Sequence, residues 1–352
     1  WLVNENNRKN SEKVLTTEEL LKNKIKYKHK KGGYNYKYAL PLNEPVEYNN
    51  SKLPINPYLL GIYLGDGSGC NGGINISTID IEIVNTLKDI LGVDYKLIPN
   101  NLNTNYYIKY IGKDKYKQDI KGINPLYREI CNMGLNVKYD KKNIPDIYKY
   151  STIEDRFELI RGLMDSDGSC SKKGNAEFSV KNEKLANDFV EICRSLGIYC
   201  RIVKEDKGII TKNFPNGKEY DIHSLKFRVY IRTNKPIFKL SRKLNKLLGG
   251  KDTSKVSIVS LDYIGNYNAS CIGVDNNDKL YLTKDYIVTH NSVVMASYLM
   301  RTLYTVRNAK CTVLGFTFNP DLKAITDYMQ ESITNMVPAF KINVNNNDTE
   351  KQ

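Results

Sequence analysis

The sequence predicts an α+β protein with an internal duplication. Two segments, 59–67 and 160–168, share a pattern in which an apolar helix leads into an acidic residue and then a glycine. Similar strand and helix patterns follow both segments in the same order. A strand at 225–232 alternates apolar and polar residues with a period of two. Helices and half-buried strands are therefore expected within each copy.

Helix-start signals precede both segments. Pro54 and Pro57 come before the first, and Ser151, Thr152 and Glu154 come before the second in the manner of a capping box. Small residues four positions apart then lie on one face of each helix, namely Gly61 and Gly65 in the first and Gly162 and Ser166 in the second. Small residues let two helix backbones approach closely. We therefore expect the two helices to pack together and to end side by side.

The duplication extends beyond the helices. The first is followed by a strand pattern at 73–78, a helical pattern ending at 91–93 and a strand at 95–98; the second by corresponding patterns at 176–181, 196–198 and 200–203. The recurrence of one order of elements is stronger support for two related units than either motif alone.

The paired helices would place Asp66 and Asp167 next to each other. Two adjacent carboxylates in a basic protein indicate a hard divalent cation. A calcium-binding EF-hand is the simpler alternative, because Asp165-Ser-Asp-Gly168 looks like the start of such a loop. The spacing excludes an EF-hand. The glycine comes two positions too early, and no glutamate, Glu177 included, stands at the position that closes such a loop.

The two motifs resemble the LAGLIDADG, or DOD-type, homing endonuclease family over residues 53–248. The resemblance implies two pseudo-symmetric αββαββα-type repeats, with paired central helices and a β-saddle that binds DNA. The last acidic residue of each motif binds the catalytic metal in that family, which corresponds to Asp66 and Asp167 here, with Mg²⁺ as the expected cofactor. Asp165 has no acidic counterpart in the first motif, where Leu64 stands, so we expect it to be structural.

The strand at 225–232 is the expected DNA-contacting element. Leu225, Phe227, Val229 and Ile231 fall on one face, and Lys226, Arg228, Tyr230 and Arg232 on the other. A cationic face in a DNA groove can contact phosphates and, through arginine, guanine edges. A solvated face is the simpler interpretation of a lone strand, but beside a duplicated metal-binding helix pair we expect DNA contact.

Lys181, which follows Phe178-Ser-Val, is the sequence candidate for an accessory basic residue near the scissile phosphate. Ile79 stands at the matching place of the first repeat, so the partner of Lys181 is not identified.

A separate signal lies at His290-Asn291-Ser292. The amide of Asn291 can attack its own main-chain carbonyl and break the bond to Ser292, with His290 as general acid. The hydroxyl of Ser292 can then accept an acyl group. Taken alone, the tripeptide is equally typical of an exposed turn after a strand.

The stretch 271–291 resembles the C-terminal splicing block of inteins, which often carry a homing endonuclease. Cys271 falls where that block often has an assisting Asp or Cys, although a buried structural cysteine is an equal alternative. No opening Cys or Ser nucleophile and no Thr-x-x-His block precede Trp1. We therefore expect an N-terminally truncated intein whose missing N-terminal half is needed for splicing.

These resemblances divide the chain into five expected segments: 1–52, remnant of the splicing half; 53–150, first repeat; 151–250, second repeat; 251–291, C-terminal splicing segment; and 292–352, C-extein. The last segment has a helix, strand, helix order and resembles the α/β ATPase of phage terminase large subunits after its phosphate-binding loop. Ser292 would then end a Gly-Lys-[Ser/Thr] motif.

Composition agrees with a polyanionic partner. The 53 Lys and Arg residues against 39 Asp and Glu give a net charge of +14. Codons rich in A and T can account for part of this excess. The seven cysteines include no Cys-x-x-Cys pair, and the three histidines are scattered, so no zinc site is expected. Free thiols favour a reducing, cytoplasmic location in the host cell of a virus or phage, and no membrane segment is evident.

The expected function is that of a monomeric endonuclease, embedded in a self-splicing intein, that hydrolyses both strands of a long asymmetric DNA site in the intein-free host gene. Two alternatives remain open: a nucleic-acid-binding module that has lost cleavage, and a splicing element with a decayed endonuclease.

Overall fold

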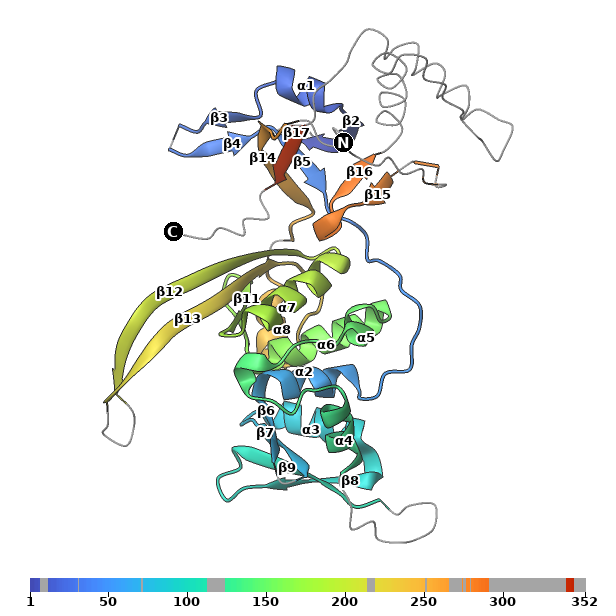
Figure 1. Cartoon of the computed structure of the whole chain (residues 1–352), viewed down its shortest axis with the longest axis vertical. Coiled ribbons are helices and arrows are strands. Elements are labelled where there is room, and N and C mark those ends of the chain that lie inside the picture. The colour runs from blue at the N-terminus through green and yellow to red at the C-terminus, as the bar shows by residue number, and fades with distance from the viewer. Residues whose placement is uncertain are drawn as a thin grey trace. The chain divides into compact units, whose positions relative to one another are not determined.

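The computed structural model describes residues 1–6, 12–30, 32–70, 72–112, 124–213, 219–250, 252–265, 274, 277–278, 280–290 and 340–344. The chain forms two compact units. One combines Trp1–Asn43 with Ser254–Asn345, and the other contains Glu44–Thr253. A unit assembled from both ends of the chain thus brackets a second unit in the sequence (Figure 1).

The first unit is built on a five-stranded sheet with the order β17-β14-β5-β1-β2, in which every neighbouring pair is antiparallel. The strands are β1 (Leu2–Glu5), β2 (Glu12–Val14), β5 (Tyr38–Pro41), β14 (Lys255–Tyr263) and β17 (Phe340–Val344). Its small core contains Val3, Leu20, Tyr38, Leu40 and Ile258. Because β5 pairs with β14, the chain leaves this sheet and returns to it on adjacent strands.

Smaller elements complete the first unit. Helix α1 (Thr17–Lys22) begins with a capping box between Thr16 and Glu19. Two hairpins have sheets of their own: β3 (Lys26–Lys28) with β4 (Tyr34–Tyr36), and β15 (Leu280–Leu282) with β16 (Val288–His290). The short 3₁₀ turn η3 (Lys284–Tyr286) connects the second hairpin.

The second unit begins with helix α2 and a four-stranded antiparallel sheet of order β6-β7-β9-β8. Its elements are α2 (Pro57–Asp66), β6 (Gly67–Cys70), β7 (Gly73–Ser77), α3 (Ile81–Leu91), η1 (Gly92–Asp94), β8 (Tyr95–Pro99), β9 (Asn105–Tyr110) and α4 (Pro125–Asn132). The connection to the next helix contains η2 (Tyr139–Lys141) and α5 (Asp146–Lys149).

The same order of elements follows a second time, with a sheet of order β10-β11-β13-β12. Its elements are α6 (Ile153–Ser166), β10 (Gly168–Cys170), β11 (Ala176–Val180), α7 (Glu183–Ser195), β12 (Tyr199–Asn213), β13 (Glu219–Arg232) and α8 (Ser241–Leu247). The recurrence of helix, strand and sheet order expected from the sequence is therefore present in the mixed, antiparallel fold of this unit.

Helices α2 and α6 pack on each other through their small residues. A Cβ atom added at Gly61 would lie 2.5 Å from the carbonyl oxygen of Leu159, and one at Gly162 would collide with the carbonyl oxygen of Tyr58. The close helix approach expected from the sequence is confirmed. Both helices belong to one large core that spans the two repeats.

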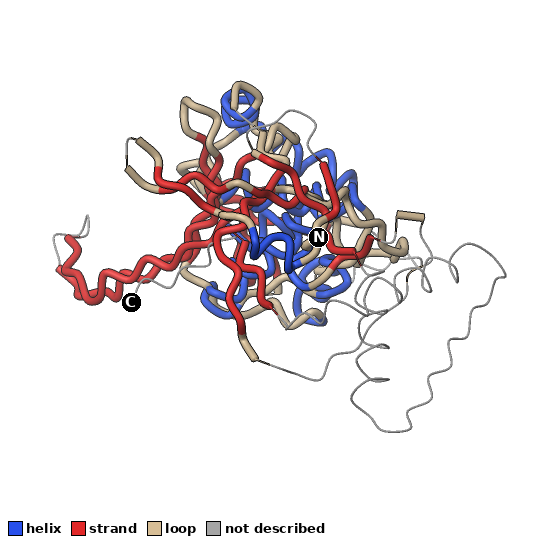
Figure 2. Tube along the Cα trace, turned by 90° about the horizontal axis from the view of Figure 1, so that it is seen from above, coloured by secondary structure: helices blue, strands red, loops and turns tan. Residues whose placement is uncertain are grey.

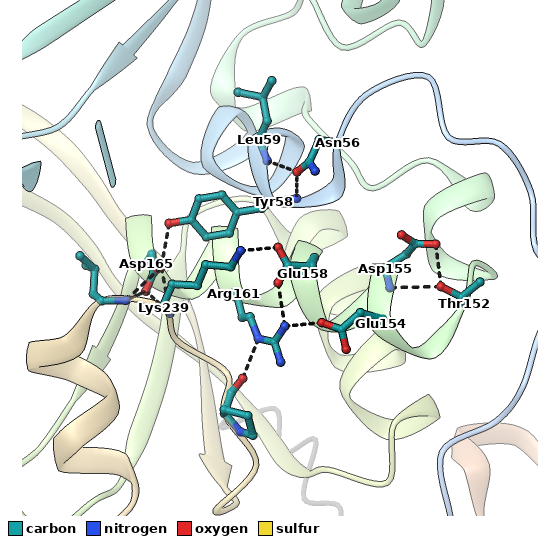
Figure 3. Close-up of polar contacts among 12 residues, drawn as sticks. Asn56, Tyr58, Leu59, Thr152, Glu154, Asp155, Glu158, Arg161, Asp165 and Lys239 are labelled. Atoms are coloured by element: carbon teal, nitrogen blue, oxygen red, sulfur yellow. Dashed lines mark hydrogen bonds and ion pairs between the residues drawn. The ribbon is translucent and has the colours of Figure 1, made fainter. Parts of the chain in front are cut away.

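Side-chain caps start both central helices. Asn56 accepts from the amides of Tyr58 and Leu59 ahead of α2. At α6 the cap is formed by Thr152 and Asp155, each bonded to the other (Figure 3). The capping box expected with Glu154 is therefore displaced by one residue, because Glu154 instead pairs with Arg161.

The strands β12 and β13 form a ribbon that extends beyond the rest of their sheet (Figures 1 and 2). Strand β11 pairs with β13 only from Phe227 to Ile231, whereas β12 pairs along the whole of β13. The register shifts between Asp206 and Ile209, as at a β-bulge, which bends a ribbon locally. Among the described residues, no helix has the length and apolar character to cross a membrane.

Candidate active site

Two carboxylates meet where the central helices end. Asp66 is the last residue of α2, and Asp167 is the C-cap of α6. Because the glycine contacts hold the helices together, the Oδ2 atom of Asp167 lies 3.2 Å from the position that a Cβ on Gly65 would occupy. The negative charge of Asp66 is close enough to raise the pKa of Asp167.

The environment disfavours ionisation of both groups. Burial, followed by the charge of Asp66, raises the pKa of Asp167 to about 6. Burial also raises the pKa of Asp66, although the positive charges of Lys243 and Lys142 oppose this shift. Adjacent carboxylates with raised pKa values are typical of functional sites rather than of structural helix ends.

Two buried lysines complete the site, and neither was selected in the sequence analysis. The Nζ atom of Lys142 donates to the carbonyl oxygens of Tyr63 at 2.6 Å and of Gly67 at 2.7 Å. Lys142 thus caps the C-terminal end of α2, where carbonyls lack helical partners. Burial lowers its pKa to about 8, and the charges of Asp167 and Asp66 oppose that change.

Lys243 performs the same task for the second helix. Its Nζ atom donates to the carbonyl oxygens of Met164, Asp165 and Gly168, at 2.9, 2.7 and 2.7 Å. Burial lowers its pKa, while the charge of Asp165 raises it. Lys142 follows Asp66 at the same sequence distance at which Lys243 follows Asp167. That equal offset is the signal that could have identified both lysines.

Tyr139 contacts only one of the carboxylates. Its hydroxyl donates to Oδ2 of Asp167 at 3.3 Å, and burial together with the Asp167 charge raises the pKa of Tyr139, which keeps the hydroxyl protonated. Leu240 holds the corresponding position of the second repeat, three residues before Lys243. The two halves of the site are therefore chemically different.

The donor set suits a hard divalent cation. Asp66 and Asp167 offer carboxylate oxygens at the negative ends of two helix dipoles, and both features favour a cation such as Mg²⁺ or Ca²⁺. Within the described part of the chain, no group of three or more His, Cys, Asp or Glu residues is arranged to hold a metal alone. Any cation here would need further oxygen ligands from water or from a bound phosphate.

Asp165 has a structural environment, as its lack of an acidic counterpart suggested. Its carboxylate accepts from the hydroxyl of Tyr58 at 2.8 Å and from the backbone amides of Lys239 and Leu240 (Figure 3). It therefore ties the segment before α8 to both central helices.

Lys181 is exposed just after β11, and its accessory role stays a prediction. The positive charges that act on Asp66 and Asp167 come from Lys142 and Lys243.

The alternating pattern expected for 225–232 is confirmed by burial. Phe227, Val229 and Ile231 are buried, and the opposite face is open, with Lys226 and Arg232 exposed and Arg228 and Tyr230 partly exposed. Arg228 is held in place by acidic neighbours, which the sequence did not indicate.

The guanidinium of Arg228 donates twice to Glu177, at 2.7 Å each, and once to Glu205 at 2.8 Å. These partners, Glu177 first, raise the pKa of Arg228. Arg201 lies opposite Tyr230 on the same face, and its Nε atom is buried without a hydrogen-bond partner. Arg201 is thus a further basic group on this face.

The splicing candidates are only partly within the described residues. His290 ends β16, whose Val288 and Thr289 are buried. Asn291, Ser292 and Cys271 lie outside the described residues, as does the expected extein except for β17.

A family model matches part of the second unit. Residues 143–232 match the family model described as homing endonuclease. This segment is therefore similar to homing endonucleases. The matched segment runs from the residue after Lys142 through α6 and Asp167 to the end of β13.

Curated relatives match only in part. The replicative DNA helicase DnaB of Mycobacterium intracellulare is 26% identical over 251 residues, which cover 70% of this chain and 36% of the helicase. The homothallic switching endonuclease of Saccharomyces cerevisiae (strain ATCC 204508 / S288c) is 24% identical over 157 residues, 40% of this chain and 27% of that protein. The chain therefore spans less than two fifths of either relative.

Solved structures of the homing endonuclease I-DmoI are distant neighbours. Mesophilic variants of I-DmoI align with a TM-score of 0.33 and 16% identity, covering 56% of this chain and 94% of theirs. I-DmoI in complex with DNA and Ca aligns with a TM-score of 0.32 and 17% identity, covering 51% and 82%.

Proposed function

We propose that the second unit is a metal-dependent endonuclease that hydrolyses both strands of double-stranded DNA. The observation that carries the proposal is the meeting of Asp66 and Asp167 at the ends of two tightly packed helices, each end capped by a buried lysine. Since one chain supplies both helices, the enzyme would act as a monomer.

The arrangement favours cleavage over the alternative of a binding module without activity. Two partly buried carboxylates whose pKa values are raised, that of Asp167 in part by the charge of Asp66, cost folding free energy. A purely structural turn would avoid that cost with asparagine. Retention of both charges is understandable if they hold a cation such as Mg²⁺, which would activate water and stabilise the leaving oxygen.

The protein's own groups have distinct roles in this proposal. Asp66 and Asp167 would hold the cation. Lys142 uses two of its three N–H donors on helix carbonyls, so the third can reach a phosphate oxygen or water. Its lowered pKa, about 8, suits a group that exchanges protons near neutral pH. Lys243, with three carbonyl partners, mainly positions the end of α6.

The polar faces of the two sheets would bind the DNA. On the second sheet, Lys226, Arg228, Tyr230 and Arg232, together with Arg201, form such a face. The strands β12 and β13 have 15 and 14 residues, whereas β8 and β9 have 5 and 6. Strand pairs of unequal length in the two sheets fit a long asymmetric target, such as a site in an intein-free host gene.

Metal-dependent cutting is the direct test. The variants Asp66→Asn and Asp167→Asn should each abolish double-strand cleavage of the intein-free host gene in Mg²⁺ while leaving DNA binding largely intact. Undiminished cleavage by either variant would remove the two-carboxylate mechanism. Loss of binding as well as cutting would instead point to a folding defect, which circular dichroism would reveal.

We also propose that the first unit is the splicing part of an intein. Support comes from the sequence His290-Asn291-Ser292, whose first residue ends β16, and from a β-rich unit made of both chain ends around the endonuclease segment. The resemblance of 292–352 to a terminase ATPase stays part of this proposal.

A further inference from the structure

The first unit carries a hairpin whose charge is unlike that of its surroundings. Between Glu19 and Glu44 the sequence has seven lysines and no acidic residue. The strands β3 and β4 and the turn between them lie within this stretch. We refer to residues 24–36 as the lysine–tyrosine hairpin.

One face of the hairpin combines lysine and tyrosine. Lys26 pairs with Tyr36 and Lys28 with Tyr34 across the two strands, and side chains of directly opposite residues share a face. The Nζ atom of Lys26 lies 5.1 Å from the centroid of the Tyr34 ring. The tyrosine is 52% exposed, so the face is open to a partner.

The tip of the hairpin turns tightly through two glycines. The amide of His29 donates to the carbonyl of Gly33, and the amide of Gly32 donates to the carbonyl of His29. Gly32 and Gly33 have φ values of 89° and 80°, a backbone conformation that favours glycine. Main chain without side chains can approach a ligand closely at this point.

The lysine charges of the hairpin are not compensated within the described residues. Lys24, Lys26, Lys28 and Lys30 are exposed, and none of them forms an ion pair there. Lys22, just outside the hairpin, differs because it pairs with Glu18 at 2.6 Å. Arg228 in the second unit is likewise held by two glutamates. The hairpin therefore presents positive charge that is available to an external anion.

We propose that the lysine–tyrosine hairpin is an additional binding surface for double-stranded DNA, one that contacts the phosphate backbone and lies in the first unit rather than on the sheets of the endonuclease. The inference rests on the proposed DNA-cleaving function for the choice of DNA as the polyanion. Lysine contacts to phosphate release counterions and carry no sequence information. The hairpin would thus strengthen binding without choosing the site.

The side chains of the hairpin argue against a membrane surface as the partner. An interfacial element needs an apolar face that enters the lipid. The exposed positions of the hairpin carry Lys, His, Tyr and Gly, and its aliphatic residue Ile25 instead packs against the core of the first unit.

The test uses the full chain with Lys26, Lys28 and Lys30 changed to Gln. Binding to a long duplex of arbitrary sequence is measured between about 50 and 200 mM salt. We expect the slope of log affinity against log salt to become shallower by about three units, since each phosphate contact contributes roughly 0.9. Affinity at the lower salt concentrations should fall at least about tenfold.

A matched variant with Lys22, Lys255 and Lys284 changed to Gln removes the same charge from the same unit, and it should keep most of the parental slope. Equal slopes in the two triple variants would overturn the proposal and assign the effect to net charge. Binding of the parent to phosphatidylserine vesicles that depends on the hairpin, without an effect on DNA, would also overturn it.

A second measurement uses the parent chain, so that the proposal stays testable if the triple variant folds poorly. Acetylation of lysines in the parent, read by mass spectrometry, should be slowed by DNA at Lys26, Lys28 and Lys30 and not at Lys22. Unprotected hairpin lysines in a chain that binds DNA would refute the hairpin and leave the endonuclease intact. If the hairpin lysines are protected but the Asp66→Asn variant still cleaves DNA, the catalytic proposal is refuted and the proposed DNA contact of the hairpin stands.

Discussion

The hydroxyl of Tyr139 donates a hydrogen bond to Asp167 at 3.3 Å, and this contact makes the two halves of the candidate site unequal. In the second repeat the corresponding position is Leu240, whose side chain cannot donate. A hydrogen bond to the ionised form lowers the pKa of Asp167 and partly offsets its burial. Asp66 receives no such help among the described contacts.

Replacing Tyr139 with Phe should therefore raise the pKa of Asp167 further. The acidic limb of the pH–rate profile for DNA cleavage should move to higher pH, because Asp167 must be ionised to hold a cation. At pH 6 we expect a loss of about tenfold in single-turnover rate, the effect of one lost hydrogen bond of roughly 1.4 kcal/mol. Tyr150→Phe removes a hydroxyl that bonds to Glu191 instead, and serves as the matched control.

The partly buried carboxylate of Asp167 should also limit stability. The folded-state pKa of Asp167 is about 6, above its ordinary value of 3.8. Ionised Asp167 thus destabilises the fold, fully so above pH 6, and the penalty vanishes as pH falls below 3.8. In a chelator, Asp167→Asn should raise the free energy of unfolding at pH 7 by up to about 3 kcal/mol, and by much less at pH 4.

Urea unfolding at both pH values measures this effect. A variant less stable than the parent at pH 7 would show that Asp167 is stabilised by its neighbours rather than strained by them.

The buried lysines provide a third prediction. Lys142→Met keeps the length of the side chain but removes its charge and donors, and should reduce cleavage by about 100-fold or more. Lys243→Met should act mainly by loosening the end of α6, with a smaller loss of rate and a lower melting temperature. The exposed neighbours Lys141 and Lys246 provide matched Met controls. Equal losses in Lys141→Met and Lys142→Met would refute the catalytic role of Lys142.

Local sequence pattern was sufficient to predict the central helices and the carboxylates at their ends. The signal is strong because Gly61 and Gly162 must be small for the helices to touch, and Asp66 and Asp167 follow at fixed positions on the same helices. The inward and outward faces of β13 were predictable for a similar reason, since burial of Phe227 imposes a period of two.

Contacts between distant segments were not predictable in this way. Lys142 and Lys243 reach the helix ends from connections far along the chain, and in a sequence with 53 Lys and Arg residues a single lysine carries little information. The pairing of Arg228 with Glu177 and Glu205 depends on the register of three strands. The one sequence signal for these lysines is their equal separation from the aspartates in the two repeats, Asp66 to Lys142 and Asp167 to Lys243.

The glutamate partners of Arg228 alter what is expected of the DNA-facing strand. Arg232 is exposed, so Arg232→Ala should make the salt slope of DNA binding shallower by about one unit. Arg228→Ala should have a smaller effect on the slope, because Glu177 and Glu205 already neutralise that guanidinium. Equal slopes for the parent and Arg232→Ala would make that end of β13 an ordinary solvated face.

The last prediction concerns the bond between Asn291 and Ser292. If the first unit performs splicing chemistry, the amide of Asn291 attacks its own carbonyl and releases the peptide 292–352, with His290 donating the proton. Asn291→Ala should abolish release, because alanine has no amide nucleophile. Ser292→Ala is the informative control, since it removes the acyl acceptor but keeps the amide, and should block ligation while still permitting the cut. Mass spectrometry of the released peptides, with an N-terminal intein half supplied, separates the two outcomes. Release from Asn291→Ala at the parental rate would end the splicing proposal, while the endonuclease proposal, which depends on Asp66 and Asp167 in the other unit, would stand.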